Sequence, residues 1–558
     1  MPALRFPQVT PDIRPVEARR PQALEAGLFM LVVALPLAFF PQSRSAFLDV
    51  KILVLATGTL LVWASGLPVD RRLALPTLVW AAVIAVAALA GVDPVESLIG
   101  TVRGTGLVLL LCAAALVALA PNVPAELLER ARGWLVVTGL VVAAVAVVSR
   151  LAPDVLEVVA RRTSFIGSTF GNPVHAAGFI AACIPAVLAD KRRRLWVVAL
   201  AVYGLGMGAA EERTAYLLPI VALVAAAWYL RPGWRRIAVA VAVVGVGLAL
   251  WAIAPSSVVA NGPPERYTAV GQFQTLVGER QRLAVYEANA RAFTERPVLG
   301  WGPANTWSGF LSAATAQEID TAGRNWADAH NLLLEMAVVS GAIGLAAFGW
   351  LLLRLVPRAI RPEGGRGWAT ASALTLAVFA FFEPMNVVLT PLLFLLAGAS
   401  AFRAVSVSAA PERGRRSGTV GRTAATVGLA CLVVLAGVNL AASGLEQWGH
   451  THYGSNWALR AATGFAPWRL TATEALAMSL AVDGRAGDGA AANEARDVVD
   501  RAVRDHPLNP GVRLLAADVE LLLRNFPATQ QWIRDQLRVF PNDDLTVPEH
   551  EPGTTIAR

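Results

Sequence analysis

A series of apolar stretches, each close to the length that crosses a lipid bilayer, constrains this chain more than any other feature. A membrane-spanning helix needs about 20 mostly apolar residues, and about thirteen such stretches occur. Because lipid offers no partner to backbone polar groups, each stretch must satisfy them internally. The sequence therefore predicts an all-α, polytopic membrane protein. The stretches lie near residues 23–40, 47–66, 72–91, 105–121, 133–149, 174–189, 195–210, 214–230, 236–254, 332–353, 367–382, 385–401 and 423–443.

Composition agrees with this fold class and excludes others. The chain is 55% hydrophobic and 16% charged, with a mean hydropathy of +0.53. Its net charge of +8 would suit nucleic acid, but most of the excess lies in short loops between apolar stretches. The positive-inside rule accounts for basic loops of that kind, so no nucleic-acid partner is predicted. The three cysteines lie in apolar stretches and imply no disulfide framework.

The basic loops alternate along the chain and set its orientation. With the N-terminus inside, the cytoplasmic loops are 71–72, 130–132, 191–194, 231–236, 354–366 and 403–422, all rich in arginine or lysine. The opposite loops at 93–96 and 211–213 are acidic or mixed, as is the long loop 255–331. That long loop is therefore predicted to be extracytoplasmic.

The chain divides into five parts. We predict a cytoplasmic tail at 1–22, a twelve-span body at 23–402, a cytoplasmic linker at 403–422, a thirteenth span at 423–443 and an extracytoplasmic domain at 444–558. The last part has a soluble, mildly acidic composition and reads as short helices. Helix pairs joined near Asp505–Pro510 resemble tetratricopeptide-like repeats. Such an array serves as an interaction surface for a protein partner, or as a passive cap.

The stretch Gly278–Gly344 carries most of the sequence features that suggest a site. Leu283, Tyr286, Ala290 and Phe293 have helical spacing and predict an amphipathic helix. A turn rich in glycine and proline follows at 296–303, where glycines can adopt backbone angles closed to other residues.

The same stretch ends in Asp328-Ala329-His330-Asn331, directly before a long apolar helix. Asn331 is expected to cap that helix, which places His330 at an end that favours anions. His330 is either a structural histidine or a functional one. The position at the end of a long polar loop favours a functional role.

Arginines at the outer ends of spans are the other candidates. Arg213 either contacts a ligand or is an interfacial arginine paired with Glu211 or Glu212. Arg280 and Arg282 are two residues apart, so on a helix one can face a site while the other faces solvent. The planar fork of arginine suits phosphate oxygens, so converging arginines indicate a phosphate or diphosphate.

Two further outer segments contribute candidates. The segment 161–173 contains Arg162 and Asn172, and either approaches a ligand or is a simple turn into the sixth stretch. The loop Asp93–Gly106 contributes Arg103. No histidine cluster has a convincing metal-ligand spacing, and we predict neither a metal nor a cofactor.

Together these segments resemble the O-antigen ligase/O-antigen polymerase superfamily of bacterial polyprenyl-linked glycan transferases. The resemblance covers about residues 25–402. It rests on the order and spacing of the Asp93–Gly106 loop, Gly167–Asn172, Arg213, Arg282 with Tyr286, the Pro297–Gly302 turn, and His330–Glu335 with Gly341–Gly344. Tyr286 stands where the family more often has tryptophan, and His175 where it has an aromatic residue or an amide.

The resemblance implies a GT-C-like fold in the bacterial inner membrane, with the site outside the cytoplasm. It implies that Arg213 and Arg282 hold the diphosphate of a polyprenyl-linked glycan donor and that His330 is essential. His330 is then a base toward the acceptor hydroxyl or a diphosphate partner. The implied reaction is metal-independent and inverts the anomeric carbon; the acceptor is a lipid, a glycan or a protein.

Three alternatives to a ligase remain. A polymerase that joins repeat units shares the same signature. A transporter of lipid-linked glycans would show two similar halves and charges at mid-membrane, and neither is evident. A scaffold that acts through its C-terminal domain leaves the 255–331 loop unexplained.

Overall fold

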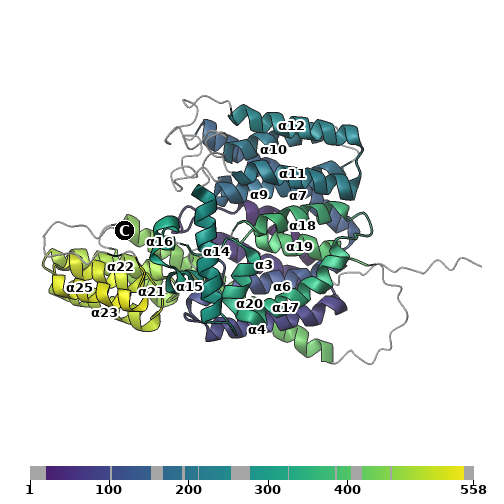
Figure 1. Cartoon of the computed structure of the whole chain (residues 1–558). Coiled ribbons are helices and arrows are strands. Elements are labelled where there is room, and N and C mark those ends of the chain that lie inside the picture. The colour runs from purple at the N-terminus through teal and green to yellow at the C-terminus, as the bar shows by residue number, and fades with distance from the viewer. Residues whose placement is uncertain are drawn as a thin grey trace, which may run out of the picture.

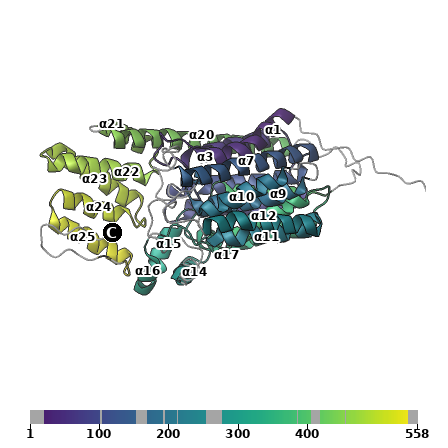
Figure 2. The same ribbon diagram turned by 90° about the horizontal axis from the view of Figure 1, so that it is seen from above.

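The computed structural model describes residues 20–100, 104–152, 168–190, 195–210, 213–252, 277–324, 326–383, 386–403, 417–452, 455–543 and 545. Across these ranges all regular structure is helical. Figures 1 and 2 show a bundle of roughly parallel and antiparallel helices with a smaller group of helices at one end. The predicted all-α, polytopic fold class is confirmed.

A helix is present at every stretch that the hydropathy pattern marks. These helices are α1 (Pro21–Phe29) continuing through η1 (Met30–Ala34) and α2 (Leu35–Leu37), α3 (Asp49–Ala64), α4 (Arg71–Ala90), α6 (Leu107–Leu119), α7 (Ala125–Leu151), α9 (Pro173–Ala189), α10 (Trp196–Ala210), α11 (Arg213–Leu230), α12 (Trp234–Ala252), α17 (Leu332–Ala359), α18 (Gly367–Ala380), α19 (Leu389–Ser400) and α20 (Ser417–Thr451). By length and composition, five of these helices are long and apolar enough to cross a bilayer; they are α4, α7, α12, α17 and α20. Most of the others are shorter apolar helices.

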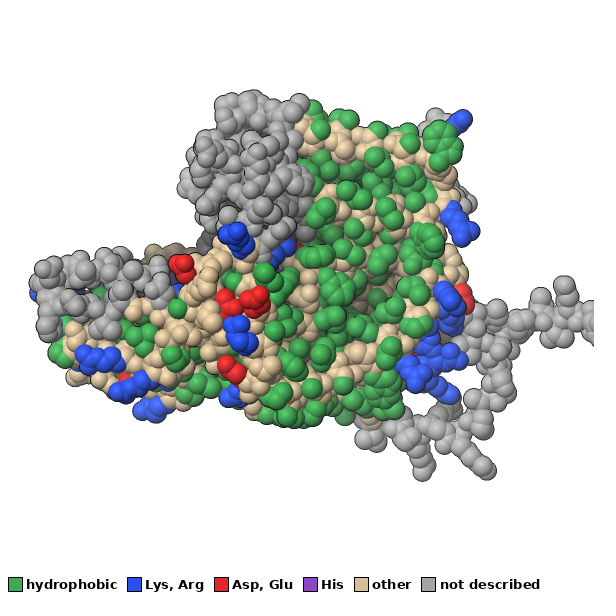
Figure 3. All heavy atoms as spheres, in the orientation of Figure 1, with side chains coloured by type: hydrophobic (Ala, Val, Ile, Leu, Met, Phe, Trp, Pro, Cys, Tyr) green, Lys and Arg blue, Asp and Glu red, His purple; other side chains and the backbone are tan. Residues whose placement is uncertain are grey.

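The bundle is held by apolar packing inside and presents apolar side chains outside. Trp80 of α4, Phe348 of α17 and Phe394 of α19 are buried against one another, with ring centroids 5.3 to 6.2 Å apart. A wide apolar surface covers the bundle, and lysine and arginine gather at its edge far from the smaller helical group (Figure 3). Exposed Arg235, Arg354 and Arg361 lie in the loops and helix ends of the predicted cytoplasmic side.

Between α12 and α17 lie the helices that connect the bundle to the smaller group. They are α14 (Val277–Glu295), α15 (Thr306–Ala313) and α16 (Ala316–Ala322). Shorter pieces elsewhere are α5 (Glu96–Ile99), η2 (Ala120–Asn122) and η4 (Ser168–Phe170). α14 stands across the end of the bundle, between it and the smaller group (Figure 1).

The glycine-rich turn at 297–302 is wedged into a break in α17. Gly341 has a φ of +64° inside that helix, which interrupts it. The freed carbonyls of Val338 and Val339 accept from the N–H groups of Trp301 and Gly302, at 2.8 and 3.0 Å. A Cβ on Gly341 would lie 2.3 Å from the carbonyl oxygen of Val298. The close approach explains why glycine is needed here, and it fixes the long loop to the start of α17.

The C-terminal part, which we call the tail, is a set of antiparallel helices. They are α21 (Asn456–Phe465), α22 (Leu470–Arg485), α23 (Gly489–Asp505), α24 (Val512–Leu522) and α25 (Phe526–Val539). α22 packs on α23, and α24 on α25. The repeat-like character of the pairs stays a prediction. α20 is one continuous helix from Ser417, inside the predicted linker, to Thr451, past the predicted end of the thirteenth span at 443.

Buried polar contacts fix the tail to the end of the bundle. Arg469, before α22, is 1% exposed and donates to Asp49 of α3 at 2.9 Å and to Glu446 of α20 at 2.8 Å. His506, after α23, lies 2.5 Å from the carboxylate of Asp93. Arg324 of the long loop pairs with Asp543 at 2.8 Å. Charges buried in such pairs are costly to separate, so the tail is a fixed part of the molecule.

Candidate functional site

The backbone around His330 is held in an unusual conformation by three side chains. His330 has a φ of +50°, a region that non-glycine residues rarely adopt. Its N–H donates to Oδ1 of Asp328 at 3.0 Å. The preceding N–H, of Ala329, donates to Oε2 of buried Glu335 at 2.7 Å, while Oε1 of Glu335 accepts from Thr306 at 2.7 Å. Strained residues that are fixed in this way are concentrated at functional sites.

Asn331 begins α17 as the sequence predicts. Its side-chain oxygen accepts from the N–H groups of Leu333 and Leu334, both at 3.0 Å. Its side-chain nitrogen donates to the carbonyl of Phe381 at 3.1 Å. The cap therefore satisfies the helix end and also joins it to the turn after α18. His330 lies directly before this N-terminus, as expected.

The imidazole of His330 is oriented from two sides. Its Nδ1 lies 2.5 Å from Oδ1 of Asp328, and its ring centroid lies 4.6 Å from that of Trp326. The side chain of His330 is 13% exposed, whereas that of Asp328 is fully buried. A carboxylate at Nδ1 leaves Nε2 as the atom that can exchange a proton with a ligand.

α14 brings Arg282 and Tyr286 to the same place, one helical turn apart. The hydroxyl of Tyr286 donates to the carbonyl of His330 at 3.1 Å. Burial raises the pKa of Tyr286, so this hydroxyl stays protonated as a donor. Arg282 contacts Glu383 of the turn after α18, with Nη2 and Oε1 2.6 Å apart. Helices α14 and α17 and the 381–383 turn therefore meet around His330.

Glu383 and Arg282 form a half-buried ion pair. The carboxylate is 5% exposed and the guanidinium 39% exposed. Burial raises the pKa of Glu383, while the charges of Arg282 and His330 oppose that rise. In the part of the chain that is described, Arg282 uses one nitrogen for Glu383, and its fork remains accessible from outside. It can donate to an anionic ligand while Glu383 fixes its position.

The buried face of α14 is not made by the residues whose spacing predicts the helix. Those residues are Leu283, Tyr286, Ala290 and Phe293. Leu283 is 56% exposed, and the buried face consists of Ala284, Val285, Ala288, Asn289 and Ala292. Small residues face inward because α15 and α16 pack closely against α14, which places Arg282 and Tyr286 on the side toward His330.

The structure brings together only part of the predicted site. Arg280 is exposed on α14, two residues before Arg282. Asn172 caps α9 by accepting from Val174 N–H at 2.9 Å and His175 N–H at 3.4 Å, a structural role. α11 begins at Arg213, whose side chain lies outside the described structure. Arg103 and Arg162 also lie outside the described residues.

Four residues of this site were missing from the predicted set. Asp328, Trp326 and Glu335 flank His330 in sequence, so their proximity was a usable signal. Glu383 is distant in sequence, and its only signal was a charge between two apolar stretches. No three His, Cys, Asp or Glu side chains form a metal-binding group within the described ranges. The site instead offers an oriented imidazole beside an anchored, accessible guanidinium.

Part of the chain matches a known protein family. The family model described as O-Antigen ligase matches residues 196–349. The matched region runs from α10 through most of α17 and includes Arg213, Arg282 and His330. It confirms the resemblance to the O-antigen ligase/polymerase superfamily that the motifs indicated. No curated protein matches the chain significantly.

Proposed function

We propose that this multi-pass membrane protein of the O-antigen ligase/polymerase superfamily is a ligase-type glycosyltransferase. It transfers a glycan from a polyprenyl-diphosphate donor to a hydroxyl group of a lipid, glycan or protein acceptor. One observation carries the proposal. His330, oriented by Asp328, and Arg282, anchored by Glu383, meet at one end of the bundle, within or beside the region that matches the family.

In the proposed reaction His330 is the general base. Nε2 accepts the proton of the acceptor hydroxyl, and that oxygen attacks the anomeric carbon with inversion. The bond from the anomeric carbon to the phosphate oxygen breaks, and its electron pair leaves with the lipid diphosphate. Asp328 stabilises the imidazolium that forms. The base role is preferred over the diphosphate-partner role because the carboxylate of Asp328, 2.5 Å from Nδ1, can stabilise the imidazolium that proton transfer produces.

Arg282 is proposed to stabilise the negative charge that builds on the leaving diphosphate. Arg213, which opens α11, and Arg280 on α14 are proposed as further diphosphate contacts. Arg103 and Arg162 stay proposed as substrate-binding residues. The proposed reaction uses no metal and no cofactor.

We further propose that the site and the tail face outward from the bacterial inner membrane. Basic residues gather at the opposite edge (Figure 3), as the positive-inside rule requires of a cytoplasmic edge. In a variant without native cysteines, Gln317→Cys and Ala490→Cys, both exposed positions, should react with an impermeant thiol reagent in intact cells. Gly414→Cys, in the predicted linker, should not; the reverse pattern contradicts this orientation.

The test of function is transfer by the purified full chain in lipid nanodiscs. The donor is a defined polyprenyl-diphosphate oligosaccharide, offered with a lipid-linked saccharide, a free oligosaccharide or a peptide as acceptor. A single transferred glycan on the acceptor supports a ligase, and products that grow by repeat units indicate the polymerase alternative. Absence of transfer with every acceptor contradicts the proposal. Loss of transfer with EDTA that magnesium restores contradicts the metal-free reaction.

A further inference from the structure

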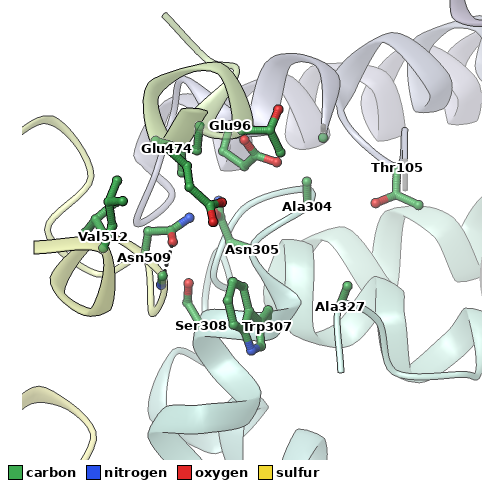
Figure 4. A pocket seen from close by; sticks show the side chains of 15 residues that line it. Glu96, Thr105, Ala304, Asn305, Trp307, Ser308, Ala327, Glu474, Asn509 and Val512 are labelled. Atoms are coloured by element: carbon green, nitrogen blue, oxygen red, sulfur yellow. Dashed lines mark hydrogen bonds between the residues drawn. The ribbon is translucent and has the colours of Figure 1, made fainter. Parts of the chain in front are cut away.

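A cavity of about 210 Å³ lies where the tail meets the body, and His330 is not among its lining residues. The body contributes Asn305, Trp307 and Ser308 of the long loop, and the tail contributes Glu474 of α22 and Asn509 before α24. Figure 4 shows Glu474, Asn305 and Asn509 directed toward the same space, with Trp307 and Ser308 below them. The cavity therefore exists only because the two parts are docked.

The lining selects against anions. Two carboxylates, of Glu96 and Glu474, line the cavity, and no basic side chain lines it in the described part of the chain. The described lining therefore disfavours a phosphate or diphosphate. Hydroxyl and amide groups make up the other polar lining, from Thr105, Asn305, Ser308, Thr471 and Asn509. These groups match a neutral ligand that is rich in hydroxyls.

Trp307 supplies a flat apolar surface beside those polar groups. Its indole nitrogen donates to the carbonyl of Arg324 at 2.8 Å, which fixes the ring. A Cβ on Gly511 would lie 3.7 Å from Cη2 of Trp307, so the far edge of the ring points toward the tail. A sugar ring combines hydroxyls with an apolar face, and an aromatic ring next to hydrogen-bonding groups suits both. The volume is below the roughly 300–1,000 Å³ of pockets for drug-sized ligands, so it suits one sugar ring.

The cavity wall and the His330 loop are mechanically one unit. Ala327 lines the cavity and directly precedes Asp328. Thr306, next to Trp307, donates to Glu335, and the other oxygen of Glu335 accepts from Ala329. A sugar held in the cavity is thus held by the same segment that orients the proposed base.

The tail wall of the cavity is itself fixed. His506, three residues before Asn509, lies 2.5 Å from Asp93, and Asp93 Oδ1 accepts from the N–H of Glu96 at 2.9 Å. Both partners of this pair are almost fully buried. The cavity is therefore preformed, and binding a sugar there does not require the tail to be ordered first.

We propose that this cavity is a subsite for one sugar ring of the acceptor, built jointly by the tail and the long loop. The proposal rests on the proposed function, because it places one ring of the acceptor glycan against the segment that continues from Ala327 into the His330 loop. It identifies the acceptor as one that carries a neutral or amino sugar. A peptide acceptor with a basic side chain would also suit the carboxylates, but it would not use the Trp307 surface.

Binding to the cavity is tested on the full chain in nanodiscs without donor. The probes are the methyl glycosides of glucose, galactose and N-acetylglucosamine, detected by saturation-transfer NMR. Glu474→Gln removes a charged acceptor and should weaken binding about tenfold. Gly511→Val, at a residue with an ordinary φ of −81°, should fill the space and abolish binding. Glu494→Gln is the matched control, because Glu494 pairs with Arg460 on the tail and does not line the cavity.

The proposal is overturned if none of the three glycosides binds, or if the Glu474 and Gly511 variants bind as the wild type does. Trilysine is the competing probe. If trilysine binds more tightly than the glycosides and displaces them, the cavity is assigned to a basic peptide instead.

A transfer assay separates this proposal from the proposed function. If both hold, Glu474→Gln raises the KM for a saccharide acceptor about tenfold and leaves kcat and the donor KM unchanged. If the wild type transfers glycan but Glu474→Gln leaves the acceptor KM unchanged, the subsite is contradicted and the proposed function is not. The wild type could instead bind the glycosides, lose that binding with Gly511→Val, and transfer no glycan. That result contradicts the proposed transferase function and supports the sugar site.

Discussion

His330 shows how a single residue is made ready for chemistry by its neighbours. Its left-handed backbone would cost about 1–2 kcal/mol unaided, and hydrogen bonds from its own N–H and that of Ala329 to Asp328 and Glu335 offset this cost. The sequence predicted Asn331 as the cap because its position before an apolar run is a local signal. It gave Asp328 no role, because the contact of that carboxylate with Nδ1 depends on a backbone angle that no spacing rule reveals.

Asp328→Asn tests whether the carboxylate assists the imidazole or only holds the loop. Asparagine keeps the size and the acceptor for the His330 N–H, but it loses the charge that stabilises an imidazolium. We expect the transfer rate to fall about 100-fold or more, within the range of general base catalysis. Asp320→Asn, at an exposed position of α16, is the control. A transfer rate within a few-fold of wild type would indicate that Asp328 only holds the loop.

At the scale of elements, hydropathy and loop charge were sufficient to predict which segments are helical, because each lipid-exposed helix must be apolar along its length. They were not sufficient for how the helices are interrupted or rotated. The break at Gly341 arises from the wedge at 297–302, a contact between segments about forty residues apart. The spacing of apolar residues predicted the helix α14 but not its buried face, because small alanines, rather than large apolar residues, make up most of that face.

Gly341→Ala tests the wedge. The new Cβ would lie 2.3 Å from the Val298 carbonyl, at a positive φ that alone costs about 1–2 kcal/mol. We expect a clear fall in the temperature of unfolding in nanodiscs and a loss of transfer, because the turn anchors the loop that carries His330. Gly349→Ala, in the same helix, meets nothing within 4 Å and should change neither quantity. If the two variants unfold at the same temperature and transfer at the same rate, the turn at 297–302 does not anchor the His330 loop.

For the whole molecule, the sequence indicated a separate C-terminal domain but not that it is locked in place. Composition marks a soluble tail. Arg469, His506 and Asp543 each pair with a residue more than two hundred positions away. These contacts bury charged side chains that the sequence alone would place in solvent. The Asp93–Gly106 loop, which contributes the substrate-binding candidate Arg103, also contacts the tail through Asp93. The tail thus helps to shape the end of the bundle that carries the candidate site.

The His506–Asp93 contact should make docking of the tail sensitive to pH. Burial opposes protonation of His506, but the hydrogen bond and charge of Asp93, with Glu96 and Asp505 nearby, raise its pKa. The stabilisation is therefore complete below the unfolded value of about 6.5 and is lost as pH rises through the higher folded value. Hydrogen exchange at residues 504–511, corrected for its intrinsic pH dependence, should speed up over that interval. His506→Gln should abolish this change; a pH response that persists in the variant must have another source.

The most direct test of the central claim is single-turnover transfer from a polyprenyl-diphosphate glycan by folded variants of the two site residues. His330→Ala should lower the rate about 100- to 10,000-fold, the contribution of a general base. Arg282→Lys keeps the charge but loses the fork and should lower it roughly 100- to 1,000-fold. His452→Ala and Arg538→Lys, exposed and remote from the site, should match wild type. Near-wild-type rates for both His330→Ala and Arg282→Lys would contradict the assignment of this site.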